Sequence, residues 1–108
     1  MKEQVNVSHK ISPVLSQAFR EMGQSYELLL KNYALDFAIA KCQKYEAEAA
    51  LLENKYHCSF SEFKSRIERM ENEENFEWED DLMDWEFATE NIKYWKDKIR
   101  DLQNVSTG

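Results

Sequence analysis

The sequence has very few residues that interrupt helices: two glycines and one proline among 108 residues. β-Sandwiches and barrels need frequent tight turns, which glycine and proline usually supply, so this scarcity argues against an all-β fold. Hydrophobic residues make up 43% of the chain and aromatic residues 13%, which is too much for a disordered protein. The composition therefore predicts one helical domain of ordinary size.

Cysteines and long apolar segments are also scarce. Cys42 and Cys58 are too far apart for a CxxC motif, so we interpret both as ordinary thiols. No apolar run approaches the roughly 20 residues that span a bilayer. Residues 1–10 (MKEQVNVSHK) lack the apolar core of a signal peptide. We therefore expect a soluble, cytoplasmic protein.

Basic residues are outnumbered by acidic ones, 14 against 21, and the formal charge is −7. Nucleic acids and anionic membranes are polyanions, so this balance opposes direct binding to either. The chain has no Glu-x-x-His pair, no zinc-binding spacing and no phosphate-cradling glycine loop. The sequence thus predicts a protein that is not an enzyme and that binds no metal or cofactor.

The chain divides into a flexible arm over residues 1–11, a single helical domain over 12–103 and a frayed tail over 104–108. Ser12 before Pro13 is typical of a helix start, with a hydroxyl cap and proline at the first helical position. The apolar stripe that follows has helical spacing: Leu15, Phe19, Met22, Tyr26, Leu29 and Tyr33. Gly23 lies inside it, which leaves open one bent helix or two shorter helices; the unbroken phase of the stripe favours the bent helix.

Residues 28–42 are apolar on most sides, a pattern that predicts a central helix buried on more than one face. The run continues without glycine or proline and predicts a helix over 25–55, about 45 Å long. A turn over 55–58 should follow. Ser59 stands three residues before Glu62, the spacing of a capping box, and predicts a short helix over 60–72.

A last helix is expected over residues 77–103. Its apolar stripe is close to a heptad register: Trp78, Trp85, Ala88, Ile92, Trp95, Ile99 and Leu102. Asp81 is the exception, because an apolar residue would be expected at that position. The fold class predicted is all-α, a small bundle or helical hairpin of three to four helices with a long central helix.

The most distinctive segment is residues 71–90, which hold ten carboxylates and no lysine or arginine. Acidic residues favour the start of a helix and could simply be solvated there. Alternatively, the acids and the aromatic residues between them form a surface that binds a basic partner protein. The candidate partner-binding residues are Glu77, Glu79, Asp80, Asp81, Met83, Asp84, Phe87 and Tyr94.

Three of these candidates, Met83, Phe87 and Tyr94, lie off the main stripe of the last helix and form a second apolar row. A second row needs a second neighbour. It is either a wider packing face within one chain, which we favour, or an exposed row that marks an interface. A homodimer or a foreign partner would cover an exposed row.

Several short motifs recur in one group of proteins. They are Lys55-Tyr56, Phe60, Phe63, Phe76, the Trp-Glu-Asp-Asp cluster at 78–81, Asp84-Trp85-Glu86, Ile99 and Leu102. Over residues 44–102 the chain thereby resembles small helical proteins encoded in prokaryotic operons beside compact toxin-like neighbours. Glycine commonly follows the Lys-Tyr pair in that group, whereas His57 stands there in this chain. The resemblance implies an antitoxin-like protein that neutralises a more basic partner by covering its functional surface. The alternative is a homo-oligomeric structural or scaffold protein without a toxin partner.

Overall fold

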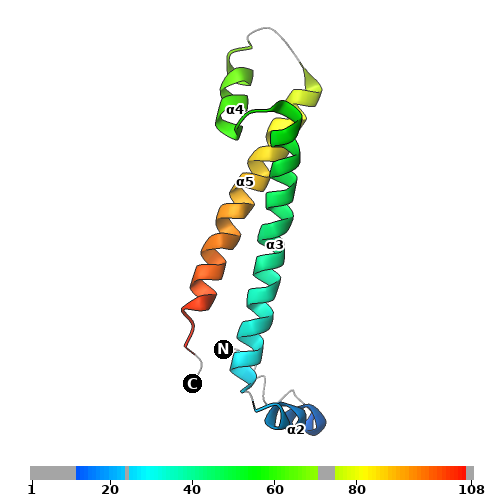
Figure 1. Cartoon of the computed structure of the whole chain (residues 1–108), viewed down its shortest axis with the longest axis vertical. Helices are drawn as coiled ribbons and strands as arrows, with labels where there is room; N and C mark the ends of the chain where they lie inside the picture. The colour runs from blue at the N-terminus through cyan, green and yellow to red at the C-terminus, as the bar shows by residue number, and fades with distance from the viewer. Residues whose placement is uncertain (1–11, 24, 71–74, 107–108) are drawn as a thin grey trace, which may run out of the picture.

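The computed structural model describes residues 12–23, 25–70 and 75–106, and these residues form helices and no strand. The helices are α2 (Pro13–Glu21), α3 (Tyr26–Tyr56), α4 (Phe60–Glu68) and α5 (Phe76–Gln103). The two long helices, α3 and α5, lie antiparallel and side by side (Figure 1). α4 packs on α5 at one end of this hairpin, and α2 lies across the N-terminal end of α3. The prediction of an all-α hairpin with a long central helix is confirmed.

Side-chain caps explain where the helices begin. The hydroxyls of Ser12, Ser25 and Ser59 each accept a hydrogen bond from the backbone N–H three residues later, at 3.1–3.2 Å. Asn75 caps α5 in the same way through its side-chain oxygen, at 3.1 Å. Glu62 completes the predicted capping box by accepting from the backbone N–H of Ser59 at 2.9 Å, and this bond lowers the pKa of Glu62.

The helix predicted to run through Gly23 is broken there. α2 ends at Glu21, and Gly23 adopts a left-handed φ of 71°, which glycine reaches without a steric penalty. The cap at Ser25 then starts α3, and an edge-to-face contact between Phe19 and Tyr26, with centroids 4.9 Å apart, joins the two helices. The prediction of one bent helix was wrong, because a single left-handed residue does not change the spacing of a hydrophobic stripe.

The expectation that residues 28–42 are buried on more than one face was also wrong. α3 packs on α5 along one stripe, in which Ala38, Cys42 and Tyr45 are buried. Burial raises the pKa of the Cys42 thiol, and both cysteines are free. Three apolar side chains on the same stretch stay 48–72% exposed: Leu30, Tyr33 and Phe37.

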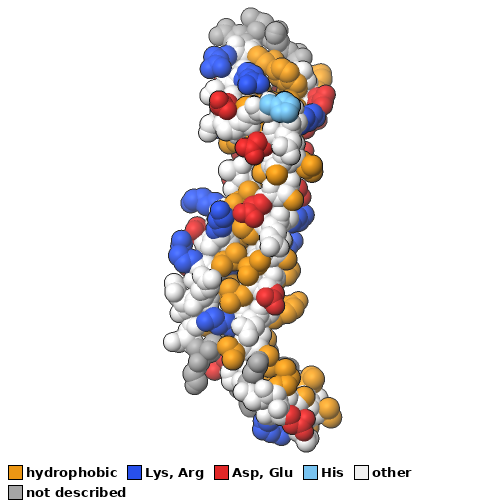
Figure 2. Space-filling model, viewed as in Figure 1, with side chains coloured by type: hydrophobic (Ala, Val, Ile, Leu, Met, Phe, Trp, Pro, Cys, Tyr) orange, Lys and Arg blue, Asp and Glu red, His pale blue; other side chains and the backbone are white. Residues whose placement is uncertain are grey.

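The molecule is elongated, with extents of 65 × 31 × 23 Å. Its radius of gyration is 21.1 Å, whereas a compact domain of this length would have about 13 Å. Hydrophobic side chains therefore reach the surface where the long helices meet and over α2 (Figure 2). The core of the described residues is correspondingly small: Ala38, Cys42, Tyr45, Phe63, Trp85 and Ala88.

A lysine joins α3 to the C-terminal end of α5, at the end of the hairpin away from α4. The ammonium of Lys31 on α3 donates to the carbonyl oxygens of Gln103 and Val105, at 3.3 and 2.9 Å. These bonds satisfy carbonyls at the end of α5, where no further helical turn supplies donors. The predicted arm, residues 1–11, and residues 107–108 of the predicted tail lie outside the described residues.

α3 ends in a backbone conformation that usually requires glycine. His57 has φ 54° and ψ 41°, and its N–H donates to the carbonyl of Glu53 at 2.7 Å. A left-handed residue at this point ends the helix and turns the chain towards α4. The Cβ of a non-glycine residue makes that conformation unfavourable by roughly 1–2 kcal/mol.

Replacing His57 with glycine should therefore stabilise the fold. We expect His57→Gly to raise the free energy of unfolding by about 1 kcal/mol, the strain relieved less the extra entropy of the unfolded chain. Urea denaturation followed by circular dichroism measures this change. His57→Ala is the control, since it removes the imidazole and keeps the strain. A glycine variant less stable than the wild type would show that the imidazole itself stabilises the turn.

Candidate protein-binding surface

An aromatic cluster fixes the N-terminal half of α5 against α3 and α4. Phe63 of α4 is fully buried, and its ring centroid lies 4.1 Å from that of Tyr56 and 5.5 Å from that of Trp85. Trp78 closes the cluster at 6.4 Å from Tyr56. Trp85 is buried and Trp78 half-buried, as expected for their places on the main stripe. This aromatic cluster thus supports the acidic segment.

Asp81 lies inside this support rather than on the outer surface. Its carboxylate accepts hydrogen bonds from the Tyr56 hydroxyl and from the Lys55 ammonium, the latter at 2.7 Å. Its side chain is only 16% exposed. Burial raises the pKa of Asp81, but the bonds from Lys55 and Tyr56 outweigh it and hold the pKa below its usual range. The polar residue on an apolar stripe is therefore the acceptor that a half-buried tyrosine hydroxyl requires.

More of the acids in residues 71–90 form ion pairs than the sequence indicated. Lys55 reaches Glu77 at 2.6 Å as well as Asp81, and these two hydrogen bonds raise its pKa. Lys64 of α4 lies 3.9 Å from Glu86. The neutralising cations come from α3 and α4, which the local sequence could not show. Glu77 and Asp81 are thereby engaged within the chain.

Four other acids on this helix are exposed and form no ion pair with any described residue: Glu79, Asp80, Asp84 and Glu90. Glu79 and Glu90 are eleven residues apart, about three helical turns, so they lie on the same side of α5. The structure therefore separates the predicted acids into a pair that holds the fold and a set that faces solvent.

The second apolar row of α5 is exposed, so it is not the wider packing face that the sequence favoured. Met83, Phe87 and Tyr94 are 53–65% exposed. Among the described residues, α5 has α3 and α4 as packing neighbours, and both lie on its main stripe. One chain therefore leaves more than half of each of these side chains exposed.

The row continues from α5 onto α3. The ring of Phe87 meets Tyr45 with centroids 5.8 Å apart, and Tyr94 touches Trp95, which in turn meets Phe37 at 5.7 Å. Leu30, Tyr33 and Phe37 share one side of α3 by their spacing. We call the exposed members of this surface the aromatic face: Leu30, Tyr33, Phe37, Met83, Phe87 and Tyr94.

Lysines border the aromatic face. The ammonium groups of Lys41, Lys44 and Lys98 lie 5.0–5.5 Å from the ring centroids of Phe37, Tyr45 and Tyr94 respectively. Such contacts are weakly attractive at exposed sites. The α3 half of the face was missed at the sequence level, although alternate spacings of three and four residues from Leu30 to Leu51 could have revealed it.

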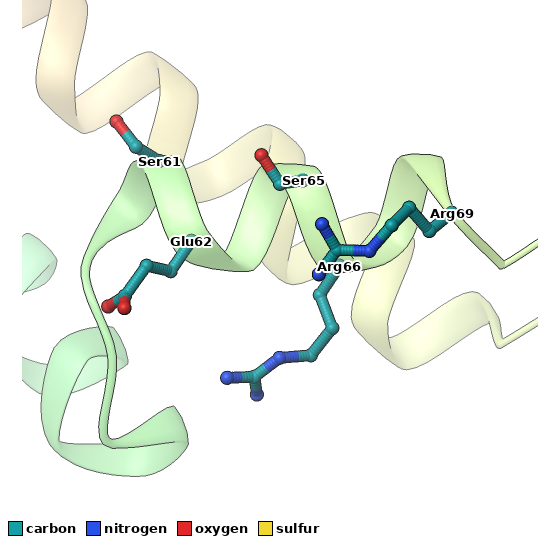
Figure 3. A pocket seen from close by; sticks show the side chains of 5 residues that line it. All are labelled: Ser61, Glu62, Ser65, Arg66 and Arg69. Atoms are coloured by element: carbon teal, nitrogen blue, oxygen red, sulfur yellow. The ribbon is translucent and has the colours of Figure 1, made fainter.

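A shallow depression lies on the surface of α4. It is lined by Ser61, Glu62, Ser65, Arg66 and Arg69. Figure 3 shows the two serines on one side of the helix and Glu62 and Arg66 on the other, so these groups do not converge on a common point. Glu62 is already engaged in the capping box. The depression has the form of an open helix surface.

The described residues contain no group of three His, Cys, Asp or Glu side chains placed to hold a metal ion. None of the helices in the described ranges has an apolar stretch long enough to cross a membrane. No protein-family model matches the chain, and neither does any curated protein or solved structure.

Removing the Asp81 carboxylate should destabilise the hairpin. We expect Asp81→Ala to lower the free energy of unfolding by about 1–2 kcal/mol, because the Tyr56 hydroxyl loses its acceptor and Lys55 a counter-ion. The double variant Tyr56→Phe with Asp81→Leu should recover most of the loss, since both polar partners are then replaced by apolar groups. Urea denaturation of the three proteins tests this, and an Asp81→Ala variant as stable as the wild type would contradict it.

Tyr56 should ionise at unusually high pH. Burial, followed by the hydrogen bond to Asp81, raises the pKa of Tyr56 to about 12. Its contribution to stability is present below the unfolded pKa of about 10 and is lost as the pH rises towards 12. Ultraviolet absorbance of tyrosinate should show one of the five tyrosines titrating late.

Two variants assign that late step. Tyr56→Phe should abolish it, and Asp81→Asn should shift it to lower pH because the negative charge beside the hydroxyl is gone. Complete ionisation of every tyrosine near pH 10 in the folded protein would contradict the expected pKa.

Proposed function

We propose that this protein is a non-catalytic protein-binding protein that masks a more basic partner with the solvent-facing surface of α5. The observation that carries the proposal is the set of exposed acids on that helix. Glu79, Asp80 and Glu90 face solvent with no ion pair to a described residue. On the opposite side of this helix, Trp85 packs on Phe63 of α4 and Asp81 bonds to Lys55 of α3.

Such an arrangement suits electrostatic recognition. Uncompensated charges on one side of a helix steer a partner of opposite charge and accelerate association. Since the supporting helix is already packed, binding would not have to order it, and less conformational entropy is lost.

The resemblance over residues 44–102 supports a finer version of this proposal. The protein would act as an antitoxin-like neutraliser that covers the functional surface of a compact, basic, toxin-like protein in the cytoplasm. The net charge of −7 suits such a partner. A helical protein that acts by covering its partner needs no cofactor and no catalytic group.

Charge reversal at the exposed acids tests the proposal. The tagged protein is used to capture its companion from the native lysate, and the affinity of the purified pair is then measured at low and high salt. We expect Glu79→Lys with Glu90→Lys to weaken binding about tenfold and to flatten its salt dependence. Asp81 is left intact, because its reversal would disturb the bonds to Lys55 and Tyr56.

The matched control is Glu53→Lys with Glu68→Lys, which changes the net charge equally through exposed acids on α3 and α4. This variant should bind like the wild type at high salt and nearly so at low salt. The proposal fails if no stoichiometric basic companion is captured, or if the α5 double variant keeps the wild-type affinity and salt dependence.

A further inference from the structure

We infer that the aromatic face binds a second copy of this chain, with the two hairpins antiparallel in a four-helix bundle. The inference goes beyond the proposed partner and does not depend on it, because it rests on α3 and on Phe87 and Tyr94 rather than on Glu79 and Glu90. Exposed apolar patches of this extent mark sites of interaction.

The α3 part of the face has the pattern of a second helix-packing seam. From Leu30 to Leu51, residues separated alternately by three and four positions read Leu, Tyr, Phe, Ala, Lys, Ala and Leu. Such a heptad pattern favours packing against another helix. The seam that packs on α5 is a different one, centred on Ala38 and Cys42. α3 thus has two seams, and the described part of the chain covers one.

The second seam is self-complementary when read in the opposite direction. A two-fold axis at Ala40 would place Leu30 against Leu51 of the other copy and Phe37 against Lys44. Tyr33 would meet the small Ala47, and Ala40 would meet itself. The large Tyr33 then faces a small side chain, and the ammonium of Lys44 approaches an aromatic ring, as it already does within the chain.

The α5 part of the face has its own centre of symmetry at Asn91. Phe87 and Tyr94 lie at nearly equal distances on either side of it, and so do Asp84 and Lys98. An antiparallel copy would therefore place Tyr94 against Phe87 and Lys98 against Asp84. The last pairing is electrostatically complementary, and the symmetry makes it occur twice.

The two centres lie at the same level of the hairpin. Phe37 contacts Trp95, and Tyr45 contacts Phe87. The midpoint between these contacts is residue 41 on α3 and residue 91 on α5. One two-fold axis therefore satisfies both helices, although their sequences are unrelated.

The charges on the α5 part of the face are divided in the way that this axis requires. Lys98 lies on the side of the midpoint where Phe37 meets Trp95. Lys41 lies at the midpoint and Lys44 towards Tyr45, so neither contributes to this division. Glu48 and Asp84 lie between the Tyr45–Phe87 contact and the Lys55–Asp81 bond, on the other side. Antiparallel pairing brings Lys98 of each copy to Asp84 of the other, whereas parallel pairing would bring Glu48 of one copy near Asp84 of the other.

The available area is sufficient for a stable dimer. Two helices about 45 Å long and about 10 Å apart present a face on the order of 900 Å². Specific interfaces bury about 800 Å² on each partner. The face also carries aromatic side chains near its middle, where binding energy concentrates in protein interfaces.

Sedimentation equilibrium of the purified full-length protein over a wide concentration range tests the inference. We expect a reversible dimer. Lys98→Asp should raise the dissociation constant about tenfold, as should Asp84→Lys, because each reversal affects two symmetric pairs. The double variant Lys98→Asp with Asp84→Lys should restore dimerisation to near the wild-type level, which a purely structural effect of either substitution would not do.

Tyr33→Asp should abolish the dimer while the monomer stays folded, since this side chain is 72% exposed in one chain. Ile39→Asp is the matched control: it places the same charge on an exposed apolar residue of α3 outside the seam. Circular dichroism confirms that each variant is helical. A monomeric wild type at all concentrations, or a dimer that survives Tyr33→Asp, overturns the inference.

This result is separable from the partner experiment. Dimerisation is measured on the protein alone and responds to Lys98, Asp84 and Tyr33, whereas capture of a basic companion responds to Glu79 and Glu90. A wild-type protein that stays monomeric but captures a basic companion would contradict only the dimer. A wild-type protein that dimerises but captures no companion would contradict only the proposed function.

Discussion

The packing of α3 on α5 is the interaction on which the rest of the structure depends. Two helices that lie side by side can bury only the stripe on which they meet, and the opposite side of each stays in water. Small residues allow the close approach: Ala38, Cys42 and Ala88 are all buried there. The thin core, the extended shape and the uncovered aromatic face are consequences of this two-helix layer.

The register of that layer is set at the end where α4 joins it. Phe63 packs against both Tyr56 and Trp85, and the carboxylate of Asp81 accepts from the Tyr56 hydroxyl and the Lys55 ammonium. A half-buried network of this kind penalises any sliding of the helices, because a slip by one turn would leave its polar groups unpaired. The levels at which distant residues meet, such as Phe37 and Trp95, follow from it.

Local signals in the sequence predicted the helix starts and the long central helix, because capping and periodicity act over a few residues. The capping box at Ser59 and Glu62 is an example. The break at Gly23 was not favoured, since one left-handed residue leaves the hydrophobic period in phase. The burial of residues 28–42 was overestimated, because an apolar helix does not specify how many neighbours the same chain will supply.

The candidate site was predictable in part for the same reason. The sequence identified Asp81 as out of place, but its partners Tyr56 and Lys55 lie on another helix, and only the fold could show them. The exposed row of Met83, Phe87 and Tyr94 was identified, while its burial state was not. Its continuation onto α3 was visible in principle, as a second heptad seam that begins at Leu30.

The two proposed interactions reinforce each other electrostatically. In the antiparallel pair, Lys98 of each copy lies against Asp84 of the other, so this ammonium is neutralised at the interface. Glu79 and Glu90 have no such partner in the described chain and remain on the outer side of each α5. Each chain carries a charge of −7, so a pair would present two acidic edges with a doubled net charge. A basic protein would then be steered more strongly by the dimer than by the single chain.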